Sequence, residues 1–130
     1  MKKENIESIY PLSPMQKGML FHSIDVQESK VYVVVVHFSL HGTLNVSAFK
    51  QAWQHVLNRH PVLRTFFVWK NRLKPLQIVR RQVELPWQEH DWRQVSLTAQ
   101  ANLLKSFLKA DQEKGFNLTK APLMLSLIHI

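Results

Sequence analysis

Histidine is the residue type in this sequence with the clearest potential for metal or acid–base chemistry, and it occurs seven times. His37 and His41 share one face of a predicted strand, but four positions of strand separate them by about 13 Å, too far for one ion. His55 and His60 are five positions apart near the end of a helix that Pro61 stops, and no His-Glu-x-x-His motif or carboxylate-rich loop occurs. The pattern therefore predicts no metal site and no directly bound cofactor.

Nucleophile and phosphate-binding motifs are absent from the sequence. It has no cysteine, no Gly-x-Ser-x-Gly elbow and only three glycines, which excludes a thiolate nucleophile and a glycine-rich phosphate loop. The stretch NRHPVLRTFFVW, residues 58–69, is more distinctive. On residue type alone, we expect Arg59 and His60 to be exposed cations at a helix end, where the helix dipole favours positive charge. We expect Arg64 to face solvent from a strand.

Composition and charge indicate a single globular domain without export or membrane signals. The 130 residues are 45% hydrophobic, and the absence of cysteine suits a reducing compartment such as the cytoplasm. The net charge of +8 is spread out, and the densest run, Lys70 to Arg81, surrounds a predicted hairpin, so we expect a solvated edge and no nucleic-acid partner. Gln16 and Lys17 interrupt the first apolar run, which excludes a signal peptide.

The elements near the N-terminus begin with residues 1–9, which are polar and predict a leader or linker. A capping box then starts a helix at Pro14, because Ser13 suits the N-cap and Gln16 stands three positions later. Gly18 in mid-helix predicts close backbone packing. The apolar residues of this helix, which we expect to face the core, are Met15, Met19, Leu20 and Ile24.

The middle of the chain alternates between strand and helix signals. Residues 31–42, VYVVVVHFSLHG, are rich in β-branched and aromatic side chains and predict a central strand. Asn45 caps a helix that Pro61 ends. Residues 62–83 predict a hairpin, and residues 86–92 an irregular connection. The inner side of the helix is predicted to carry Phe49, Ala52, Trp53, Val56 and Leu57.

The C-terminal third predicts a helix and a strand. Residues 98–114 have helical periodicity and end at Gly115, and residues 123–130 form an apolar strand that reaches the last residue. An apolar strand end is unusual for a terminus, so we expect a fragment with an unpaired edge that favours self-association. The order of elements predicts an α+β fold with helices packed on a mixed sheet.

Two motifs resemble one protein family. LSPMQKGMLFH, which includes Ser13, Pro14, Met15 and Gln16, is similar to the first motif of the condensation domains of nonribosomal peptide synthetases. RHPVLRTFF resembles their second motif, Arg-His-x-x-Leu-Arg-Thr-x-Phe. The residues that match it are Arg59, His60, Leu63, Arg64, Thr65 and Phe67. The segment GFNLTKAPLMLSLIHI also resembles the family, so the resemblance assigns residues 10–130 to the N-terminal lobe.

The resemblance implies a chloramphenicol-acetyltransferase-like lobe, incomplete in this chain. In this family two lobes form a V, and phosphopantetheine arms of carrier proteins enter from opposite sides. An acceptor amine then attacks a donor thioester to form an amide. The catalytic histidine belongs to a third motif, His-His-x-x-x-Asp-Gly, which is expected beyond Ile130 and is absent from these residues. The chain therefore has no catalytic residue and is expected to be inactive alone.

The resemblance also implies a structural role for Arg64, which would pair with the aspartate of the third motif. Because that aspartate is absent from the sequence, we expect Arg64 to be solvated or paired elsewhere, and not buried against a carboxylate of this chain. Three alternatives stay open: an epimerisation domain, a starter acyltransferase domain, and a non-catalytic module that binds a carrier protein. In the last of these, the basic charge would steer an acidic carrier protein.

Overall fold

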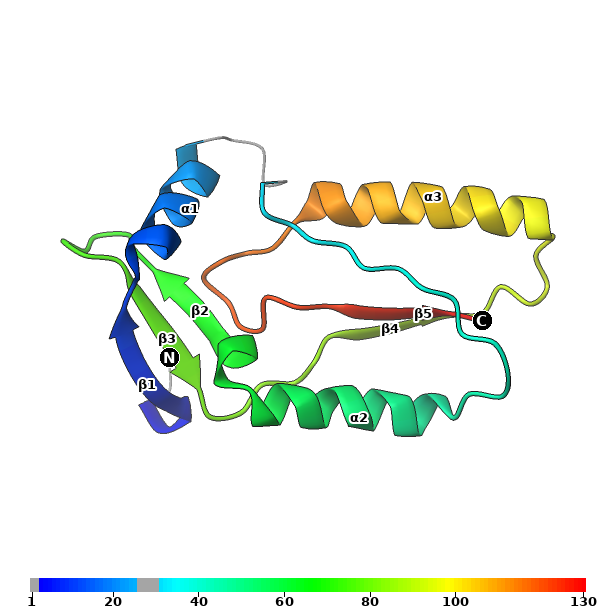
Figure 1. Cartoon of the computed structure of the whole chain (residues 1–130), viewed down its shortest axis with the longest axis horizontal. Coiled ribbons are helices and arrows are strands. Elements are labelled where there is room, and N and C mark those ends of the chain that lie inside the picture. Colours follow the sequence, from blue (N-terminus) through cyan, green and yellow to red (C-terminus); the bar gives the residue numbers. More distant parts are fainter. Residues whose placement is uncertain (1–2, 26–30) are drawn as a thin grey trace.

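The computed structural model describes residues 3–25 and 31–130 and combines two sheets with three α-helices (Figure 1). The helices are Pro14–Asp25 (α1), Val46–Arg59 (α2) and Leu97–Lys114 (α3). The strands are Ile6–Pro11 (β1), Thr65–Val68 (β2), Leu76–Arg80 (β3), Trp87–His90 (β4) and Ser126–His129 (β5), with short 3-10 turns at Lys3–Asn5 and Pro61–Arg64. No helix in these two ranges is long and apolar enough to span a membrane.

An antiparallel sheet in the order β1-β3-β2 forms one end of the molecule. The hairpin predicted over residues 62–83 is confirmed by β2 and β3, which pair from Thr65–Val79 to Val68–Leu76. The predicted leader is wrong over residues 6–9, because β1 occupies residues 6–11 and pairs with β3, with a register shift between Ile6 and Ser8. The sheet buries Phe66, Ile78 and Val79, each at most 4% exposed.

Helix α1 starts where the capping box predicted and packs less deeply than expected. Only Leu20 is buried, at 4% exposure, whereas Met15 is 77% exposed, and Met19 and Ile24 also reach solvent. A Cβ atom on Gly18 would meet nothing within 4 Å, so the predicted close packing is wrong. The helix lies at the side of the three-stranded sheet (Figure 1), and most of its large apolar side chains are exposed.

Helices α2 and α3 lie on either side of a parallel β4–β5 pair (Figure 1). Phe49 of α2 packs edge-on against Trp87 of β4, with ring centroids 6.0 Å apart. Phe107 of α3 packs against His129 of β5 at 5.2 Å. The irregular connection predicted at residues 86–92 is therefore partly wrong, since β4 occupies its centre.

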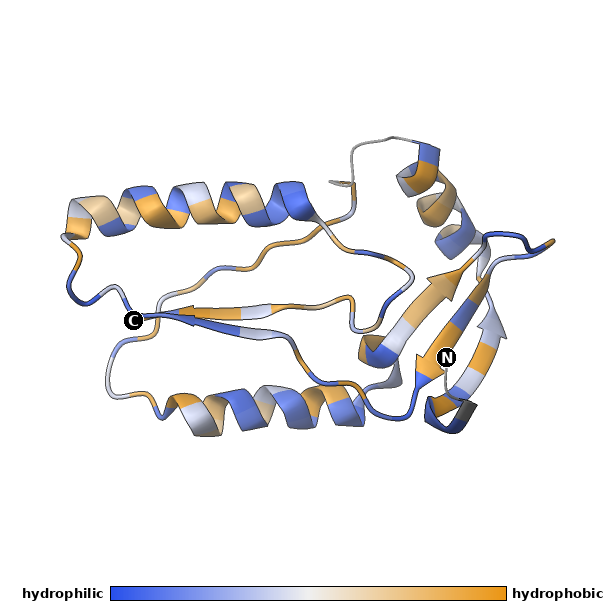
Figure 2. Ribbon diagram, turned by 180° about the vertical axis from the view of Figure 1, so that it is seen from behind, coloured by the Kyte–Doolittle hydropathy of each residue, from blue (hydrophilic) through white to orange (hydrophobic). Residues whose placement is uncertain are grey.

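The strand predicted at residues 31–42 is not a strand in the structure. The segment is extended, but among the described residues it has no strand partner, and Val34 and Val36 are 82% and 76% exposed. It runs between α2 and α3, and most of its residues are hydrophobic (Figures 1 and 2). Its β-branched composition favours an extended backbone, but a sheet also requires a neighbouring strand that these residues do not provide.

Candidate functional site

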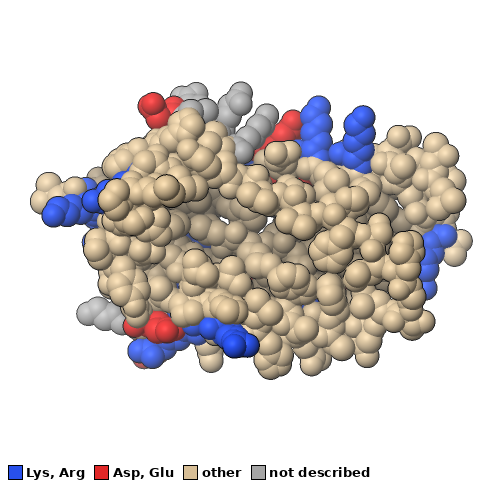
Figure 3. Space-filling model, in the orientation of Figure 1, with Lys and Arg blue, Asp and Glu red and all other residues tan. Residues whose placement is uncertain are grey.

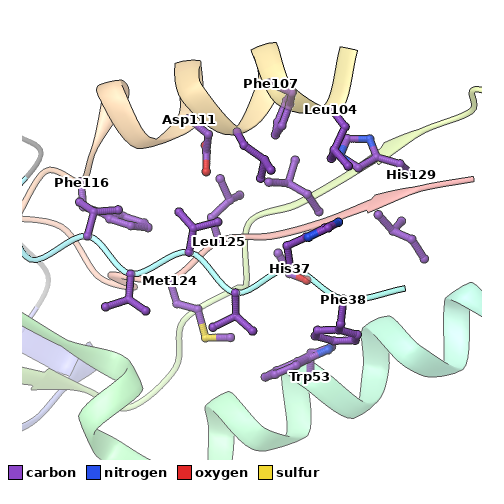
Figure 4. Close-up of a pocket in the computed structure, with 18 of the residues that line it drawn as sticks. His37, Phe38, Trp53, Leu104, Phe107, Asp111, Phe116, Met124, Leu125 and His129 are labelled. Atoms are coloured by element: carbon purple, nitrogen blue, oxygen red, sulfur yellow. The ribbon is translucent and has the colours of Figure 1, made fainter. Parts of the chain in front are cut away.

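A hollow of about 1320 Å³ opens between α2, α3, β5 and the extended segment 31–44. Figure 3 shows uncharged side chains around it, with Lys and Arg at the edges of this face. Apolar side chains dominate the close-up in Figure 4, where Phe38, Trp53 and Phe116 surround Met124 and Leu125. A cavity of this kind suits an apolar group and lacks a concentrated charge.

Two histidines stack at one end of the hollow. His90 and His129 are register partners on β4 and β5, and their ring centroids are 5.2 Å apart. Trp92 stacks on His129 with centroids 4.0 Å apart, and Phe107 of α3 contacts both histidines. The His90 Nε2 and His129 Nδ1 atoms are buried and have no hydrogen-bond partner within the described part of the chain.

Burial lowers the pKa of His129 from its usual value of 6.5, and the nearby His90 and His37 lower it further. The lowered pKa favours the neutral state of the His129 ring. Within residues 3–25 and 31–130, no three metal-ligating side chains come together. This cluster was not predicted, because His90 and Trp92 fall in the stretch expected to be an irregular connection. The signal that was available is the pair Trp87 and Trp92, which flank the short stretch QEHD.

Arg64 is a buried charged residue, 5% exposed, whose guanidinium group makes several hydrogen bonds. Its Nε donates to the Leu57 carbonyl of α2 at 3.2 Å, and its Nη1 donates to the Glu7 carboxylate of β1 at 2.5 Å. Nη1 also donates to the carbonyls of Arg80 and Arg81, the latter at 3.2 Å. One guanidinium group therefore holds together the end of α2, β1 and the end of β3.

This arrangement overturns the expectation for Arg64. From the resemblance we expected Arg64 to be solvated or paired elsewhere, yet it is buried against a carboxylate of the same chain. The prediction from residue type, that Arg64 faces solvent from a strand, is also wrong. Its partner, Glu7, lies in the region predicted to be a leader, where no strand was expected. The Glu7 side chain stays 37% exposed, so its charge keeps contact with water.

The comparison with known families bears on both motifs. The sequence profile described as "Condensation domain" matches residues 6–129. The chain belongs to the condensation domain family. This membership confirms the resemblance carried by the two motifs, and it extends the match into β1.

Relatives and solved structures agree with the family. The chain is 44% identical over 123 residues to a subunit of the linear gramicidin synthase of Brevibacillus parabrevis, covering 95% of this chain and 2% of the relative. It is 36% identical over 119 residues to bacitracin synthase 1 of Bacillus licheniformis, covering 92% and 2%. The chain thus spans a small part of these relatives.

Two solved structures share the fold. A four-domain nonribosomal peptide synthetase bound to AMP and glycine has a TM-score of 0.77 at 20% identity, over 96% of this chain and 9% of that one. The starter condensation domain of rhizomide synthetase has a TM-score of 0.71 at 21% identity, over 95% and 29%. The prediction of a mixed α and β lobe of the condensation-domain type is confirmed.

The second condensation motif is divided between surface and core. Arg59 and His60 are exposed at the end of α2, where the helix ends before Pro61. Thr65 is buried, and its hydroxyl donates to the Pro61 carbonyl at 2.9 Å. The motif therefore fixes the turn that carries Arg64 from α2 into β2.

Two further residues of this motif, Leu63 and Phe67, are half-buried. The Leu63 N–H donates to the His60 carbonyl at 3.0 Å, and the Phe67 N–H donates to the Leu118 carbonyl at 2.8 Å. Because Phe67 also lines the hollow, it is the point at which the second motif reaches the cavity.

The first condensation motif attaches α1 to the sheet. Ser13 and Gln16 form the reciprocal capping box, with the Ser13 N–H donating to Gln16 Oε1 at 2.8 Å and the Gln16 N–H donating to Ser13 Oγ at 3.2 Å. The Gln16 and Gln77 side-chain amides also pair at 3.2 Å, which links the helix to β3. Pro14 and Met15 are exposed on the first turn.

Proposed function

We propose that this chain forms part of the N-terminal lobe of a condensation domain that joins carrier-bound acyl or peptidyl and aminoacyl thioesters through an amide bond. The observation that carries this proposal is the match of residues 6–129 to the family, across a fold in which both motifs have defined structural roles. The acceptor amine would attack the donor thioester carbonyl, forming the C–N bond as the C–S bond breaks and the thiol leaves.

We place the role of Arg64 in the architecture of the lobe. Its donors are directed to backbone carbonyls and to Glu7, so it holds elements together and touches no cavity lining. The histidines of the hollow are stacked on aromatic rings, and His129 has a lowered pKa. No residue of this chain is proposed as the catalytic base, and the 130 residues alone are proposed to be inactive.

An amide-forming assay tests this inactivity. Donor and acceptor carrier proteins loaded with aminoacyl thioesters would be mixed with the 130-residue chain, and dipeptidyl thioester would be followed by mass spectrometry. A complete condensation domain from the linear gramicidin synthase serves as the positive control. We expect product only in the control, and turnover by the chain alone would refute the proposed inactivity.

Carrier-protein binding is the part of the function that the chain could perform alone. Helix α1 presents Met15, Phe21 and Ile24 to solvent at 77%, 54% and 42% exposure. Phe21 and Ile24, three positions apart, share one side of the helix, whereas Met15 lies on another side, so Phe21 and Ile24 form the apolar patch that another helical domain would contact. We propose α1 as the surface that contacts a carrier protein carrying phosphopantetheine, with the basic charge assisting the encounter.

Titration calorimetry or fluorescence anisotropy with a phosphopantetheinylated carrier protein tests this contact. Phe21→Ser should weaken binding about tenfold, the size expected for losing one apolar side chain that is buried in the complex. Leu73→Ser is the matched control, because Leu73 is fully exposed at the turn between β2 and β3. Binding should also weaken as salt rises. Equal effects of the two substitutions would contradict the proposed surface.

We also propose that the chain associates with a second copy of itself. Among the described residues β5 pairs only with β4, and Val34 and Val36 of the extended segment are exposed, so a second copy could cover these apolar groups. Light scattering should show concentration-dependent association, and a strict monomer over a hundredfold range of concentration, about 1 to 100 μM, would contradict it.

We also propose a cytoplasmic location, which fits the cysteine-free sequence.

A further inference from the structure

The His90–His129 stack joins β4 to β5 through side chains in addition to the backbone ladder. The two residues are register partners, and their rings lie 5.2 Å apart at an interplanar angle of 27°. Main-chain bonds around them are the Ile130 N–H to the His90 carbonyl at 2.9 Å and the Trp92 N–H to the Ile130 carbonyl. The titratable rings therefore sit directly at the point where the strands are joined.

Neutral imidazoles favour this geometry and protonated ones oppose it. Two stacked neutral rings bury apolar surface, and the Trp92 and Phe107 rings cover their faces and edges. Two imidazolium ions at this separation would repel, and their buried nitrogens would donate protons with no acceptor among the described residues. The same contact thus changes from attractive to repulsive when protons bind.

We propose that the His90–His129 stack makes the pairing of β4 and β5 sensitive to pH, so that the two strands separate as the solution becomes acidic. The opening would widen the hollow on its β5 side, because His129 lines it (Figure 4). The proposal is independent of the carrier-binding and amide-forming roles proposed above.

The neighbouring charged groups on other elements do not counter this effect. From the extended segment, His37 faces the hollow and adds a further group that becomes positive in acid (Figure 4). From α3, Asp111 lines the hollow one helical turn beyond Phe107, and it is not among the groups that shift the pKa of His129. Helix α2 contributes only apolar side chains such as Phe49 and Trp53 to this lining.

The charged groups on β4 and its continuation are already engaged. Glu89 accepts a hydrogen bond from the Trp87 indole N–H at 2.9 Å. Asp91 pairs with Arg93 at 2.5 Å, and this contact lowers the pKa of Asp91 to about 2, so the pair stays intact in mild acid. Neither carboxylate is free to neutralise a protonated His90.

The sign of the effect follows from proton linkage. The pKa of His129 is lower in the folded chain than its usual value of 6.5, so the paired state binds fewer protons than the separated state. The contribution of the stack is complete above about pH 6.5 and is lost as the pH falls below that value. Pairing of β4 and β5 should weaken in acid while the β1-β3-β2 sheet remains.

Hydrogen exchange of the full 130-residue chain, measured by NMR between pH 7.5 and 5.0, tests the proposal. Protection factors, which correct for the intrinsic pH dependence of exchange, would be compared for the Ile130 and Trp92 amides and for the Ile78 amide of β3. We expect the first two to lose about tenfold in protection for each unit of lowered histidine pKa, and Ile78 to change less than about twofold. Equal loss in both sheets, or no loss in either, would overturn the proposal.

Two variants and one direct measurement complete the test. His129→Phe keeps an aromatic ring without a titrating group and should remove the pH dependence, whereas His55→Gln, at an exposed position on α2, should leave it unchanged. If His129→Phe does not fold, NMR titration of the wild-type imidazole signals decides the question. A pKa at or above 6.5 for both His90 and His129 would overturn the proposal, and a lower value for the pair would support it.

Discussion

Replacing Arg64 by methionine should reveal how strongly one guanidinium holds this lobe together. Methionine keeps most of the volume and removes every donor. The substitution deletes the ion pair to Glu7 and leaves the carbonyls of Leu57, Arg80 and Arg81 without these hydrogen bonds. Since three separate elements meet at this side chain, its loss should weaken the whole lobe and not a local turn.

The magnitude follows from burial. Removing one partner of a buried pair costs about 3–5 kcal/mol in the free energy of unfolding. The Glu7 side chain is 37% exposed and can be rehydrated, so we expect the lower end, about 3 kcal/mol for Arg64→Met. Glu7→Gln keeps the three carbonyl contacts of Arg64 and should cost about 1 kcal/mol.

Urea unfolding followed by tryptophan fluorescence and circular dichroism measures these changes, and a double-mutant cycle isolates the Arg64–Glu7 coupling. The control is Arg59→Met, a neighbouring arginine of the same motif that is exposed, which should change stability by less than about 0.5 kcal/mol. If Arg64→Met and Arg59→Met had equal effects, the buried network would have no structural role and the reasoning would be refuted.

Four further substitutions and one control test packing and capping by the same unfolding measurement. Leu57→Ala, at 0% exposure, should cost about 2–5 kcal/mol, and the control Leu73→Ala, at 105%, should cost almost nothing. Ser13→Ala and Asn45→Ala each remove an N-cap acceptor and should cost about 1 kcal/mol; no change would mean that water replaces the caps. Gly115→Ala, at φ 58°, should cost about 1 kcal/mol, and a gain in stability would contradict the positive φ of this C-cap.

The helices were predicted well because the signals for helix ends lie within a few adjacent residues. The Asn45 side chain accepts from the Ala48 N–H at 3.0 Å, and Gly115 adopts a positive φ directly after α3, as their residue types indicated. Neither requires knowledge of distant parts of the chain. The hairpin of β2 and β3 belongs to the same class, since both strands and their turn lie within one short stretch.

Strand pairing between distant segments could not be predicted in this way. β1 pairs with β3 from Ile6–Arg80 to Pro11–Leu76, and Asn5 exchanges two hydrogen bonds of 3.0 Å with the backbone of Gln82. Nothing in the sequence near Asn5 indicates that partner, so a polar segment with strand geometry was assigned to a leader. The opposite error arose at residues 31–42, where high β propensity occurs without a partner strand.

The network around Arg64 also bears on the role that the family resemblance implies for it. The described contacts use Nε and Nη1, whereas no described residue accepts a hydrogen bond from Nη2. A guanidinium group can donate to two carboxylates through different nitrogens. Glu7 can therefore neutralise Arg64 inside the lobe while Nη2 stays available for a further acceptor such as the aspartate of the third motif, so the pairing found here and the pairing expected from the family are chemically compatible.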